Sequence, residues 1–441
     1  MSQPTDRDRP LRLAPFRALR YNPAAVDDLG AVTCPPYDVI GADRVGAWEA
    51  ADEHNIVRLI LPRQEAGDNR YVHAASDLRR WLDAGVLVRD AERGLYVYEH
   101  TNGGAVALGL VGAISLHEPA ERKVLPHEDV FPGPVEDRAA LMAAMAAQLE
   151  PILLTYDGGG PASDVVDEVV TGAPDIVVHT SDGAEHRLWR IVDPAALRRI
   201  AADLADRTAL IADGHHRYAA YLKLRERSIP GSGTGLAMLV DARRHPLRVG
   251  SIHRSVAGLA WPAALDAARK VFAHVEVLDP QDAPSRAGWT LDAVLARLAD
   301  AKSRLAAPAF AVAADSHAAL IGAPDSAAVV ASMPPNRSQL WHSLDASVAQ
   351  HLVLEQLWGV VDSDARVAYH HNADDAVAAA GGGRGVALLL TPPRHDDVLA
   401  IAAQGERMPR KSTSFGPKPR TGLLMRLLGQ RDSGSSAETG G

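Results

Sequence analysis

The sequence predicts an α+β protein, in which a mixed β-sheet with flanking helices is followed by a second α/β region. Short apolar runs of strand length are interspersed with segments whose apolar residues recur at helical spacing. Two apolar runs flank Thr101-Asn-Gly-Gly104, a turn sequence typical of a β-hairpin, so antiparallel pairing is expected. After Ala257 the chain becomes a series of alanine-rich segments without evident site residues, which predicts a domain boundary there.

Residues 11–257 are expected to form an N-terminal α+β domain, after a loose N-terminus of residues 1–10. An edge strand or an irregular start is expected at 11–21. Strands are expected at 56–61, 95–100, 105–116, 151–156, 176–180, 185–191, 209–212, 235–240 and 247–253. Helices are expected at 71–84, 136–149, 164–170, 195–205 and 217–227.

Residues 258–428 are expected to form a C-terminal α+β domain that contains a basic loop at 405–420. Helices are expected there at 262–272, 291–305, 344–358 and 374–380. Strands are expected at 309–314, 318–322, 367–371 and 385–391. The Ser/Gly-rich residues 429–441 are predicted to be a disordered tail.

The composition narrows the class of protein. A net charge of −9 over 441 residues argues against a general nucleic-acid or membrane-surface binder. The chain has no apolar stretch of membrane-spanning length and no apolar signal core near Met1, so we expect a cytoplasmic protein. Cys34 is the single cysteine, which rules out an intramolecular disulfide. Nothing in the sequence indicates an oligomeric state.

The strongest functional signal is Asp213-Gly-His-His-Arg217, where the apolar run 209–212 passes into the helical segment 217–227. The first amides of a helix have no internal partner and the helix dipole is positive there. Gly214 allows close approach of an anion, and Arg217 offers a charged fork to two phosphate oxygens. Asp213 is then a candidate base or metal ligand. The alternative is that Asp213 only caps the helix and the histidines are solvated.

Three further motifs could contribute to a site. The prolines of Cys34-Pro-Pro-Tyr-Asp38 make a rigid turn that presents Tyr37 and Asp38, or a plain structural corner. The His127-Glu-Asp129 run could bind a divalent cation or position a hydroxyl. Asp137 and Arg138 fall in the first turn of the predicted helix 136–149, where an acidic residue also favours helix initiation. His253-Arg254 ends a predicted strand and would face Asp213 and Arg217 if the two strands are neighbours.

The basic loop 405–420 is the second strong signal. It combines five cations with three hydroxyl side chains between prolines: Arg407, Arg410, Lys411, Lys418 and Arg420, with Ser412, Thr413 and Ser414. Such a loop in an acidic protein suits an anionic ligand, because the cations supply charge and the hydroxyls donate to phosphate oxygens. It lacks the glycine spacing of a Walker loop.

Two resemblances add to this interpretation. Asp213-Gly-x-His216-Arg217-x-x-Ala220 resembles the signature of the ParB/sulfiredoxin fold, in which this turn holds nucleotide phosphates. The resemblance implies a ParB/sulfiredoxin-like mixed sheet, and some proteins of that fold are free-serine kinases. The chain is far longer than a bare module of that fold. The catalytic glutamate that those kinases keep near their N-terminus has no match here, so the base is left open.

The wider resemblance rests on six motifs: Cys34-Pro-Pro-Tyr-Asp-Val-Ile40, Leu125-Pro-His-Glu128, Asp137-Arg138, Ile211-Ala-Asp-Gly-His-His-Arg-Tyr218, Ile252-His-Arg254 and Met408-Pro-Arg-Lys-Ser-Thr413. In this order they resemble the bacterial domain-of-unknown-function family 1015 (DUF1015), from about Leu11 to Leu424. That name carries no activity, although members are associated with serine biosynthesis. The resemblance favours a functional role for the His127-Glu128 and Asp137-Arg138 pairs, because both pairs match the family pattern.

These observations predict a nucleotide-dependent phosphotransferase that acts on a small hydroxylated metabolite such as serine. It would use ATP or ADP with Mg²⁺, with Asp213 as the candidate Mg²⁺ ligand. The candidate catalytic residues are Asp213, His216, Glu128 and His127. The candidate phosphate- or nucleotide-binding residues are Gly214, His215, Arg217, His253, Arg254, Arg410, Lys411, Ser412, Thr413 and Lys418. The candidate substrate-binding residues are Tyr37, Asp38 and Arg138.

Two alternatives use the same anion cradle. A phosphomonoester hydrolase acting on phosphoserine would hold a water nucleophile through His127, His215 or His216. A non-catalytic regulator would bind a nucleotide without turnover. In each case the partner is a small phosphorylated molecule rather than a nucleic acid or a membrane.

Overall fold

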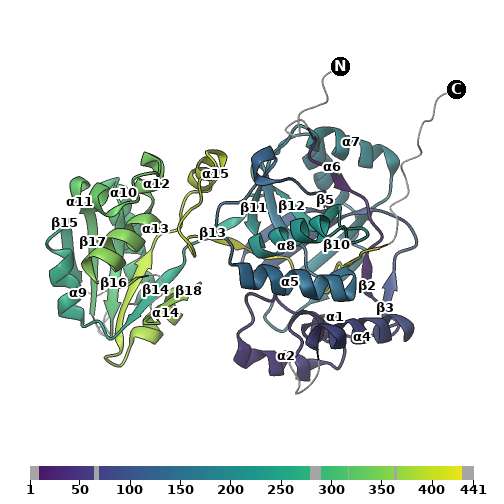
Figure 1. Ribbon diagram of the computed structural model, residues 1–441, viewed down its shortest axis with the longest axis horizontal. Coiled ribbons are helices and arrows are strands. Elements are labelled where there is room, and N and C mark those ends of the chain that lie inside the picture. The colour runs from purple at the N-terminus through teal and green to yellow at the C-terminus, as the bar shows by residue number, and fades with distance from the viewer. Residues whose placement is uncertain (1–8, 64–68, 279–289, 316, 362–364, 430–441) are drawn as a thin grey trace. The chain divides into compact units, whose positions relative to one another are not determined.

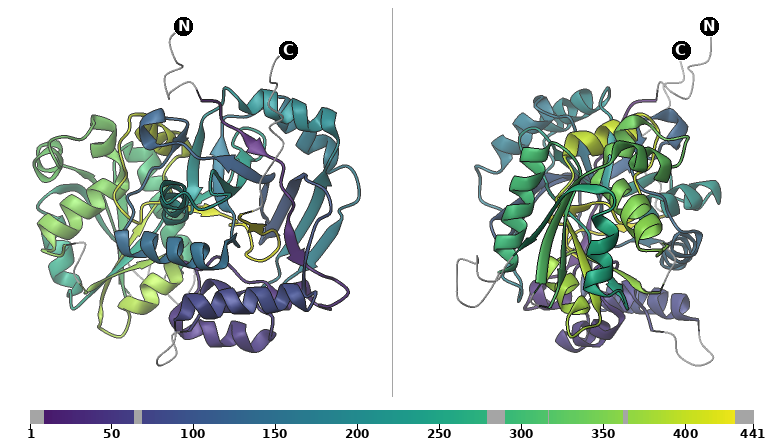
Figure 2. Two further views of the ribbon diagram at one scale, coloured as in Figure 1. Left: turned by 45° about the vertical axis from the view of Figure 1, so that its right-hand side comes forward. Right: turned by 90° about the vertical axis from the view of Figure 1, so that its left-hand side faces the viewer.

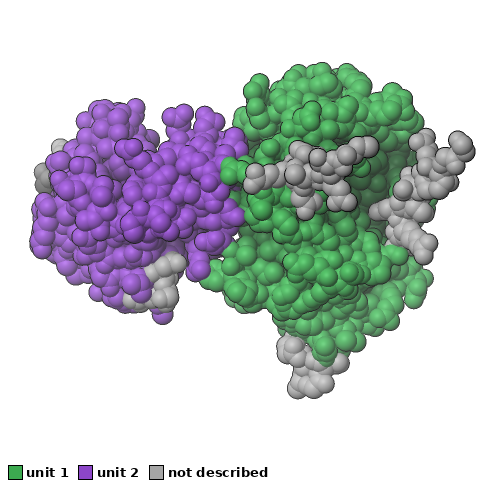
Figure 3. Space-filling model, turned by 45° about the horizontal axis from the view of Figure 1, so that its top comes forward, with its two compact units in different colours: residues 1–126, 130–248, 415–441 green, residues 127–129, 249–414 purple. Residues whose placement is uncertain are grey.

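The computed structural model describes residues 9–63, 69–278, 290–315, 317–361 and 365–429. Residues 1–8 of the expected N-terminus and 430–441 of the expected tail lie outside this part of the chain. The chain forms two compact units (Figure 3). Unit 1 comprises residues 1–126, 130–248 and 415–441, and unit 2 comprises residues 127–129 and 249–414. The region expected at 258–428 is therefore divided, with residue 415 onward in unit 1.

Unit 1 is built on a nine-stranded mixed sheet (Figure 1). The strand order is β6-β11-β8-β12-β5-β4-β10-β9, with β1 added against β5. The pairs β6–β11 and β8–β12 are parallel, whereas β4–β5 is the predicted antiparallel hairpin. The strands are β1 (Leu13–Ala14), β4 (Leu95–Asn102), β5 (Ala105–Ser115), β6 (Val124–Leu125), β8 (Ile152–Tyr156), β9 (Ile176–His179), β10 (Glu185–Ile191), β11 (Ala209–Asp213) and β12 (Thr234–Asp241). The predicted mixed sheet is thus confirmed.

The helices of unit 1 pack around this sheet and under its edge. They are α1 (Leu29–Val32), α2 (Val45–Ala51), α3 (Val57–Ile60), α4 (Arg70–Asp83), α5 (Pro132–Met145), α6 (Pro161–Val169), α7 (Pro194–Leu204) and α8 (His215–Glu226), with 3-10 turns at Ala42–Arg44 and Pro119–Glu121. Two small strand pairs complete the unit: β2 (Leu19–Tyr21) with β3 (Leu87–Arg89), and β7 (Ala147–Gln148) with β21 (Arg426–Leu427). One apolar core lies between the sheet and α5–α8, and a second lies around α3 and α4.

Two sequence-based expectations for unit 1 are wrong. The run 56–61, predicted as a strand, forms the one-turn helix α3, which buries Val57, Leu59 and Ile60. A short apolar run suits a buried helical turn as well as a buried strand, so its pattern alone does not decide. Helix α5 begins at Pro132 rather than at residue 136, with proline at its first position. Asp137 therefore lies in the second turn of α5, beyond the influence of the unpaired amides.

Unit 2 contains a six-stranded antiparallel sheet in the order β15-β17-β16-β19-β14-β18 (Figure 2). Its strands are β14 (His253–Ala257), β15 (Phe272–Leu278), β16 (Ala309–Ala314), β17 (His317–Pro324), β18 (Val367–His370) and β19 (Gly385–Leu390). The helices are α9 (Trp261–Ala268), α10 (Leu291–Leu305), α11 (Ser326–Ser332), α12 (Gln339–Ser343), α13 (Asp345–Ser347), α14 (Ala373–Ala380) and α15 (His395–Ala403). Small residues of α10, α14 and the sheet share one apolar core.

Unit 2 also departs from three expectations. The predicted helix 344–358 is mostly a π-helix at Val348–Leu357. The predicted helix 262–272 stops at Ala268, and Phe272 begins β15. The predicted strand 247–253 divides into β13 (Arg248–Gly250) and the start of β14, while β20 (Ser414–Gly416) forms within the basic loop. None of the helices in the described residues has the length and hydrophobicity that crossing a bilayer requires.

Candidate functional site

The turn between β11 and α8 has the strand–turn–helix form that the sequence predicted. Asp213 ends β11, Gly214 is the N-cap residue with φ +92°, and His215 begins α8. A side chain at position 214 would be strained by this φ, and its Cβ would lie 2.7 Å from Ile152 Cγ2. Glycine is therefore required here both by conformation and by space. Asp213 does not cap α8, because no side chain accepts a hydrogen bond at this N-cap.

Arg217 is almost completely buried and is tied to the protein. Its Nη2 donates to Asp213 Oδ2 at 2.6 Å, and its Nη1 donates to the carbonyl oxygen of Pro151 at 3.0 Å. The side chain thus joins the end of β11 to the start of β8. Burial lowers the pKa of Arg217, but the carboxylates of Glu150 and Asp213 outweigh it and raise the pKa above its ordinary value. Its Nε has no hydrogen-bond partner among the described residues.

Lys418, from the basic loop, meets the same aspartate. Its Nζ forms an ion pair with Asp213 Oδ1 and lies 3.6 Å from Asp38 Oδ2. Burial lowers the pKa of Lys418, but the two carboxylates raise it overall, so the ammonium stays charged. The Lys418 side chain is 17 % exposed and that of Asp38 is 33 % exposed. Asp38, Lys418, Asp213 and Arg217 thus form a chain of alternating charges, here called the ionic cluster, that runs from the surface into unit 1.

Tyr37 covers this cluster from the Pro-Pro turn. Its ring lies 4.4 Å from the guanidinium of Arg138 and 5.9 Å from that of Arg217. Its backbone N–H donates to Glu150 Oε1 at 2.9 Å. Burial raises the pKa of Tyr37 to about 12, so the phenol remains neutral. Glu150 was not identified from the sequence, and only its position before the strand Ile152–Tyr156 could have drawn attention to it.

Arg138 serves the scaffold more than the surface. Its Nε and Nη2 donate to Asp137 Oδ2, and its Nη1 donates to the carbonyl oxygen of Ile60 at 2.6 Å. Asp137 also accepts from Tyr71 Oη at 2.8 Å and from Arg70. The Asp-Arg motif therefore joins α5 to α3 and α4, and it holds the Arg138 guanidinium against the ring of Tyr37.

The two histidines of the turn are half-buried. His216 Nε2 accepts a hydrogen bond from the backbone N–H of Phe131 at 3.0 Å, and the two rings are parallel with centroids 6.0 Å apart. Phe131 is the N-cap residue of α5. His216 therefore ties the start of α5 to the start of α8.

A second cluster lies in unit 2, where His127 and Glu128 meet the basic loop. His127 Nε2 lies 2.8 Å from Thr413 Oγ1, and the backbone N–H of Ser412 donates to Glu128 Oε1 at 3.2 Å. Burial raises the pKa of Glu128, although these hydrogen bonds and the charge of Lys411 oppose the rise. We call this group the hydroxyl cluster. It brings together residues that the sequence placed in two separate motifs.

His253 and Arg254 are not on a strand neighbouring β11, so the expectation that they face Asp213 across one sheet is wrong. They begin β14 in the sheet of unit 2, whereas β11 belongs to the sheet of unit 1. Arg254 is fully buried and donates to the carbonyl oxygens of Ile252 and Lys411. His253 Nδ1 accepts from the backbone N–H of Leu390 at 3.2 Å. Arg410 lies exposed on the loop.

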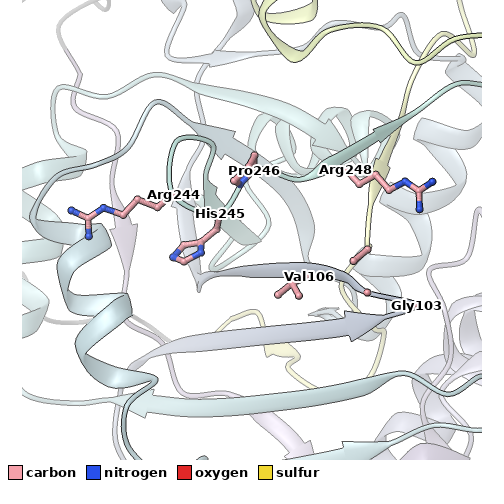
Figure 4. A pocket seen from close by; sticks show the side chains of 8 residues that line it. Gly103, Val106, Arg244, His245, Pro246 and Arg248 are labelled. Atoms are coloured by element: carbon pink, nitrogen blue, oxygen red, sulfur yellow. The ribbon is translucent and has the colours of Figure 1, made fainter. Parts of the chain in front are cut away.

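Unit 1 also has an open cavity of about 500 Å³, and none of the predicted site residues lines it (Figure 4). The β4–β5 turn and the segment after β12 line it, with Arg244 and His245 at its wall. Both side chains are paired with carboxylates, Arg244 with Asp164 and Asp167, and His245 with Asp167. These carboxylates offset the positive charge of Arg244, and Arg248 is a further cation in the lining of the cavity.

The fold and the site define a mixed α/β protein with a buried network of ion pairs at the start of a helix. Residues 13–347 match the family model described as "Protein of unknown function (DUF1015)", and the chain belongs to this family. No curated protein matches it.

Several solved structures resemble the chain. One is described as a free serine kinase in complex with AMP, with 14 % identity, 69 % of this chain and 88 % of that chain covered, and a TM-score of 0.34. Another is SbnI with C-terminal truncation from Staphylococcus aureus, with 13 % identity, 73 % and 90 % coverage, and a TM-score of 0.35. A conserved hypothetical protein from Pyrococcus furiosus has 14 % identity, 67 % and 87 % coverage, and a TM-score of 0.32. Likenesses of this size do not assign an activity to the chain.

Proposed function

We propose that the protein is a nucleotide-dependent phosphotransferase whose phosphate site is the β11–α8 turn, a turn of the ParB/sulfiredoxin type. The observation that carries the proposal is the ion pair between Lys418 and Asp213 at the start of α8. A twelve-residue helix directs its positive end at this point, and Lys418 adds a charged donor. These are the elements that an anion of several charges requires.

The ionic cluster suits a polyphosphate because its charges are held in place before the ligand arrives. Arg217 fixes the Asp213 carboxylate, and Asp213 and Asp38 fix the Lys418 ammonium. In our proposal the ammonium turns from the carboxylates to the phosphate oxygens, while Arg217 keeps Asp213 oriented. Phosphoryl transfer depends mainly on such positioning and on charge neutralisation.

Mg²⁺ fits this arrangement only together with phosphate oxygens. Among the described residues, no group of three His, Cys, Asp or Glu side chains could hold a metal ion. Asp38 and Asp213, however, flank the same ammonium, and Mg²⁺ is commonly bound by one or two carboxylates plus substrate phosphates. Asp213, whose Oδ1 the ammonium would leave in this proposal, is therefore the residue that would hold it. When bound, Mg²⁺ would neutralise phosphate charge.

The acceptor in this proposal is the hydroxyl of a small metabolite such as serine. Its oxygen attacks the terminal phosphorus of ATP or ADP, the bond from that phosphorus to the leaving nucleotide breaks, and the hydroxyl proton passes to a carboxylate. Both oxygens of Asp213 are already in ion pairs, whereas Asp38 is one-third exposed and 3.6 Å from its cation. We therefore assign the proton to Asp38.

One observation favours a second candidate, a phosphomonoester hydrolase. In unit 2, the His127 imidazole lies 2.8 Å from the Thr413 hydroxyl. The same hydroxyl lies 3.4 Å from Glu128 Oε1. An imidazole paired with a hydroxyl is the arrangement that activates a nucleophile. This candidate predicts release of phosphate from phosphoserine without any nucleotide.

The test compares the wild-type protein with Lys418→Met. The control is Lys223→Met, because Lys223 of α8 forms a partly exposed ion pair with Glu136 of α5. Thermal shifts with ATP or ADP, each with and without Mg²⁺, report binding, and mass spectrometry reports phosphoserine formed from serine. A ligand at a hundred times its Kd should add about 2.7 kcal/mol of stability. We expect this gain in the wild type and in the control, and its loss in Lys418→Met.

The same screen separates the alternatives. Phosphoserine hydrolysis without nucleotide would replace the proposal with the hydrolase, and nucleotide binding without turnover would replace it with the regulator. A wild-type protein that neither binds a nucleotide nor modifies serine would refute it. A cooperative thermal transition of Lys418→Met without ligand would show that this variant folds, and Lys418→Arg, which retains the charge, should still bind.

A further inference from the structure

The half-buried His100 and the buried His186 lie side by side, with their rings tilted by 40°, next to the segment that carries Lys418. His100 of β4 and His186 of β10 are directly opposite each other in the antiparallel pair, and their ring centroids are 4.3 Å apart. His186 is 1 % exposed. Neither residue belongs to the predicted site, and the fold alone does not require two imidazoles at this pair, where apolar side chains would pack without polar atoms to satisfy.

Each imidazole has one nitrogen engaged by the chain around Lys418. His100 Nδ1 lies 2.8 Å from the carbonyl oxygen of Lys418, which can only accept, so this nitrogen carries the proton. His186 Nδ1 lies 2.8 Å from Tyr98 Oη. That hydroxyl oxygen accepts from the backbone N–H of Arg420 at 3.1 Å, which leaves its own hydrogen for His186. The Nε2 atoms of both rings have no hydrogen-bond partner among the described residues.

These contacts hold the backbone of residues 418–420 at both ends. The Lys418 carbonyl binds His100, and the Arg420 amide binds Tyr98 and through it His186. The Arg420 side chain anchors the same segment on the other side, through Thr33 Oγ1 at 2.7 Å and the Thr33 carbonyl oxygen at 2.9 Å. The backbone from which Lys418 extends is thus fixed by polar contacts from β4 and from Thr33, the residue that follows α1, and His186 of β10 supports it through Tyr98.

Burial favours the neutral form of both rings. Burial lowers the pKa of His186 to about 3, with further lowering by His100 and Arg420, while Asp182 opposes it. Burial also lowers the pKa of His100, opposed by the Lys418 carbonyl and Asp182. Arg420 and Asp182 are the charged groups that face the pair, and Tyr98 is neutral because burial raises its pKa. A neutral pair can satisfy a carbonyl and a hydroxyl without adding a cation beside Arg420.

We propose that His100 and His186 are positioning residues, which hold the Lys418–Arg420 backbone so that the Lys418 ammonium lies against Asp213. The proposal rests on the proposed function for its consequence, since Lys418 is there the phosphate-binding cation. Its structural part, the immobilised segment, is independent of any ligand.

The test uses His100→Phe, which keeps a ring and removes both nitrogens, and His100→Asn, whose amide nitrogen replaces the donor Nδ1. His179→Phe on the adjacent strand β9 is the control, because the side chain of His179 is 74 % exposed. Hydrogen exchange of the Arg420 and Thr421 amides is measured first, without ligand. We expect exchange to be about tenfold faster in His100→Phe, as for the loss of one hydrogen bond, and close to wild type in His100→Asn and His179→Phe.

Nucleotide binding is the second readout. We expect Mg²⁺–ATP or Mg²⁺–ADP to bind about tenfold more weakly to His100→Phe, with recovery in His100→Asn. The double variant His100→Phe/Lys418→Met should bind the nucleotide no more weakly than Lys418→Met alone, because both changes act through the Lys418 ammonium. Unchanged amide exchange in His100→Phe would overturn the positioning role. Equal losses of amide protection in His100→Phe and His179→Phe would also overturn it. Faster exchange in a protein whose wild type binds no nucleotide would uphold the positioning role and refute the proposed function.

Discussion

The ionic cluster of unit 1 and the hydroxyl cluster of unit 2 both contain a carboxylate with little access to water, and they stabilise it in opposite ways: Asp213 is buried and Glu128 is half-buried. In unit 1, Asp213 lies between two cations, and the surrounding carboxylates raise the pKa of both Arg217 and Lys418. In unit 2, Glu128 is held by an amide and a hydroxyl, and burial raises the pKa of the carboxyl itself. The first arrangement retains charge and the second moves toward neutrality. Substitutions should therefore have different costs in the two clusters.

The largest effect is expected for Arg217→Met. The change leaves the Asp213 carboxylate buried with one cation fewer and removes the donor to the Pro151 carbonyl. Breaking a buried ion pair in this way costs about 3–5 kcal/mol. Hydrogen exchange of amides in β8 and β11 measures the local loss of stability. The control is Arg199→Met, which removes an exposed ion pair with Glu168 and should leave exchange unchanged.

Equal effects of Arg217→Met and Arg199→Met would mean that the ionic cluster is no more stabilising than a surface pair. The contrast between the clusters would then have no energetic basis.

A smaller effect is expected for Thr413→Val in the hydroxyl cluster. The variant keeps the shape of the side chain but removes the hydroxyl that lies 2.8 Å from His127 Nε2 and 3.4 Å from Glu128 Oε1. Leaving a buried polar group without its partner costs about 1–3 kcal/mol. Hydrogen exchange of the unit 2 amides near β14 measures this loss of stability. A loss as large as that of Arg217→Met would show that this cluster is also held by charge.

The smallest effect is expected for Glu128→Gln, and it depends on pH. The pKa of Glu128 is raised in the folded protein, so the folded state binds more protons than the unfolded state as the pH rises from the ordinary value to the raised one. The contribution of Glu128 to the free energy of unfolding is therefore fully present below its pKa in the unfolded chain, and it is lost as the pH rises through its pKa in the folded protein. Gln retains the acceptor oxygen and does not titrate. The wild type should lose stability relative to Glu128→Gln as the pH rises, measured by exchange of unit 2 amides at several pH values.

If instead the wild type becomes more stable than Glu128→Gln with rising pH, the carboxylate is stabilised by Lys411 and the hydroxyl cluster is ionic in character. That result would remove the distinction between the two clusters.

Much of the fold follows from the sequence because most elements have a pattern that only one structure satisfies. The hairpin around Gly103, the helix 291–305 and the strand 185–191 were predicted within a residue or two. The elements that were predicted wrongly have patterns that more than one structure satisfies. Residues 56–61 are apolar except for Arg58, which suits a buried turn of helix as well as a strand. The segment at Val348 has a helical pattern, but its pattern does not distinguish an α-helix from a π-helix.

The candidate site was only partly predictable. The β11–α8 turn is local, so Gly214 and Asp213 could be found from spacing. The meeting of Lys418 with Asp213 and that of His127 with Thr413 depend on tertiary structure, and their distance along the chain carries no pattern. Arg217 was expected to fork on a phosphate, but its two terminal nitrogens bind within the protein. Glu150 and the His100–His186 pair had no sequence signal beyond being polar residues near buried strands.

The discontinuity of unit 1 has a consequence for how the protein is made. The strands that support Asp213 leave the ribosome before unit 2, whereas Lys418 and Arg420 follow it, because unit 1 resumes only at residue 415. At ~5–20 residues per second, synthesis of the intervening segment takes on the order of ten seconds. During that interval the buried Asp213 and Arg217 have no Lys418, and the Thr33 carbonyl has no Arg420. The nascent sheet must therefore remain soluble with its last polar partners missing, and completion of the site becomes one of the final events of folding.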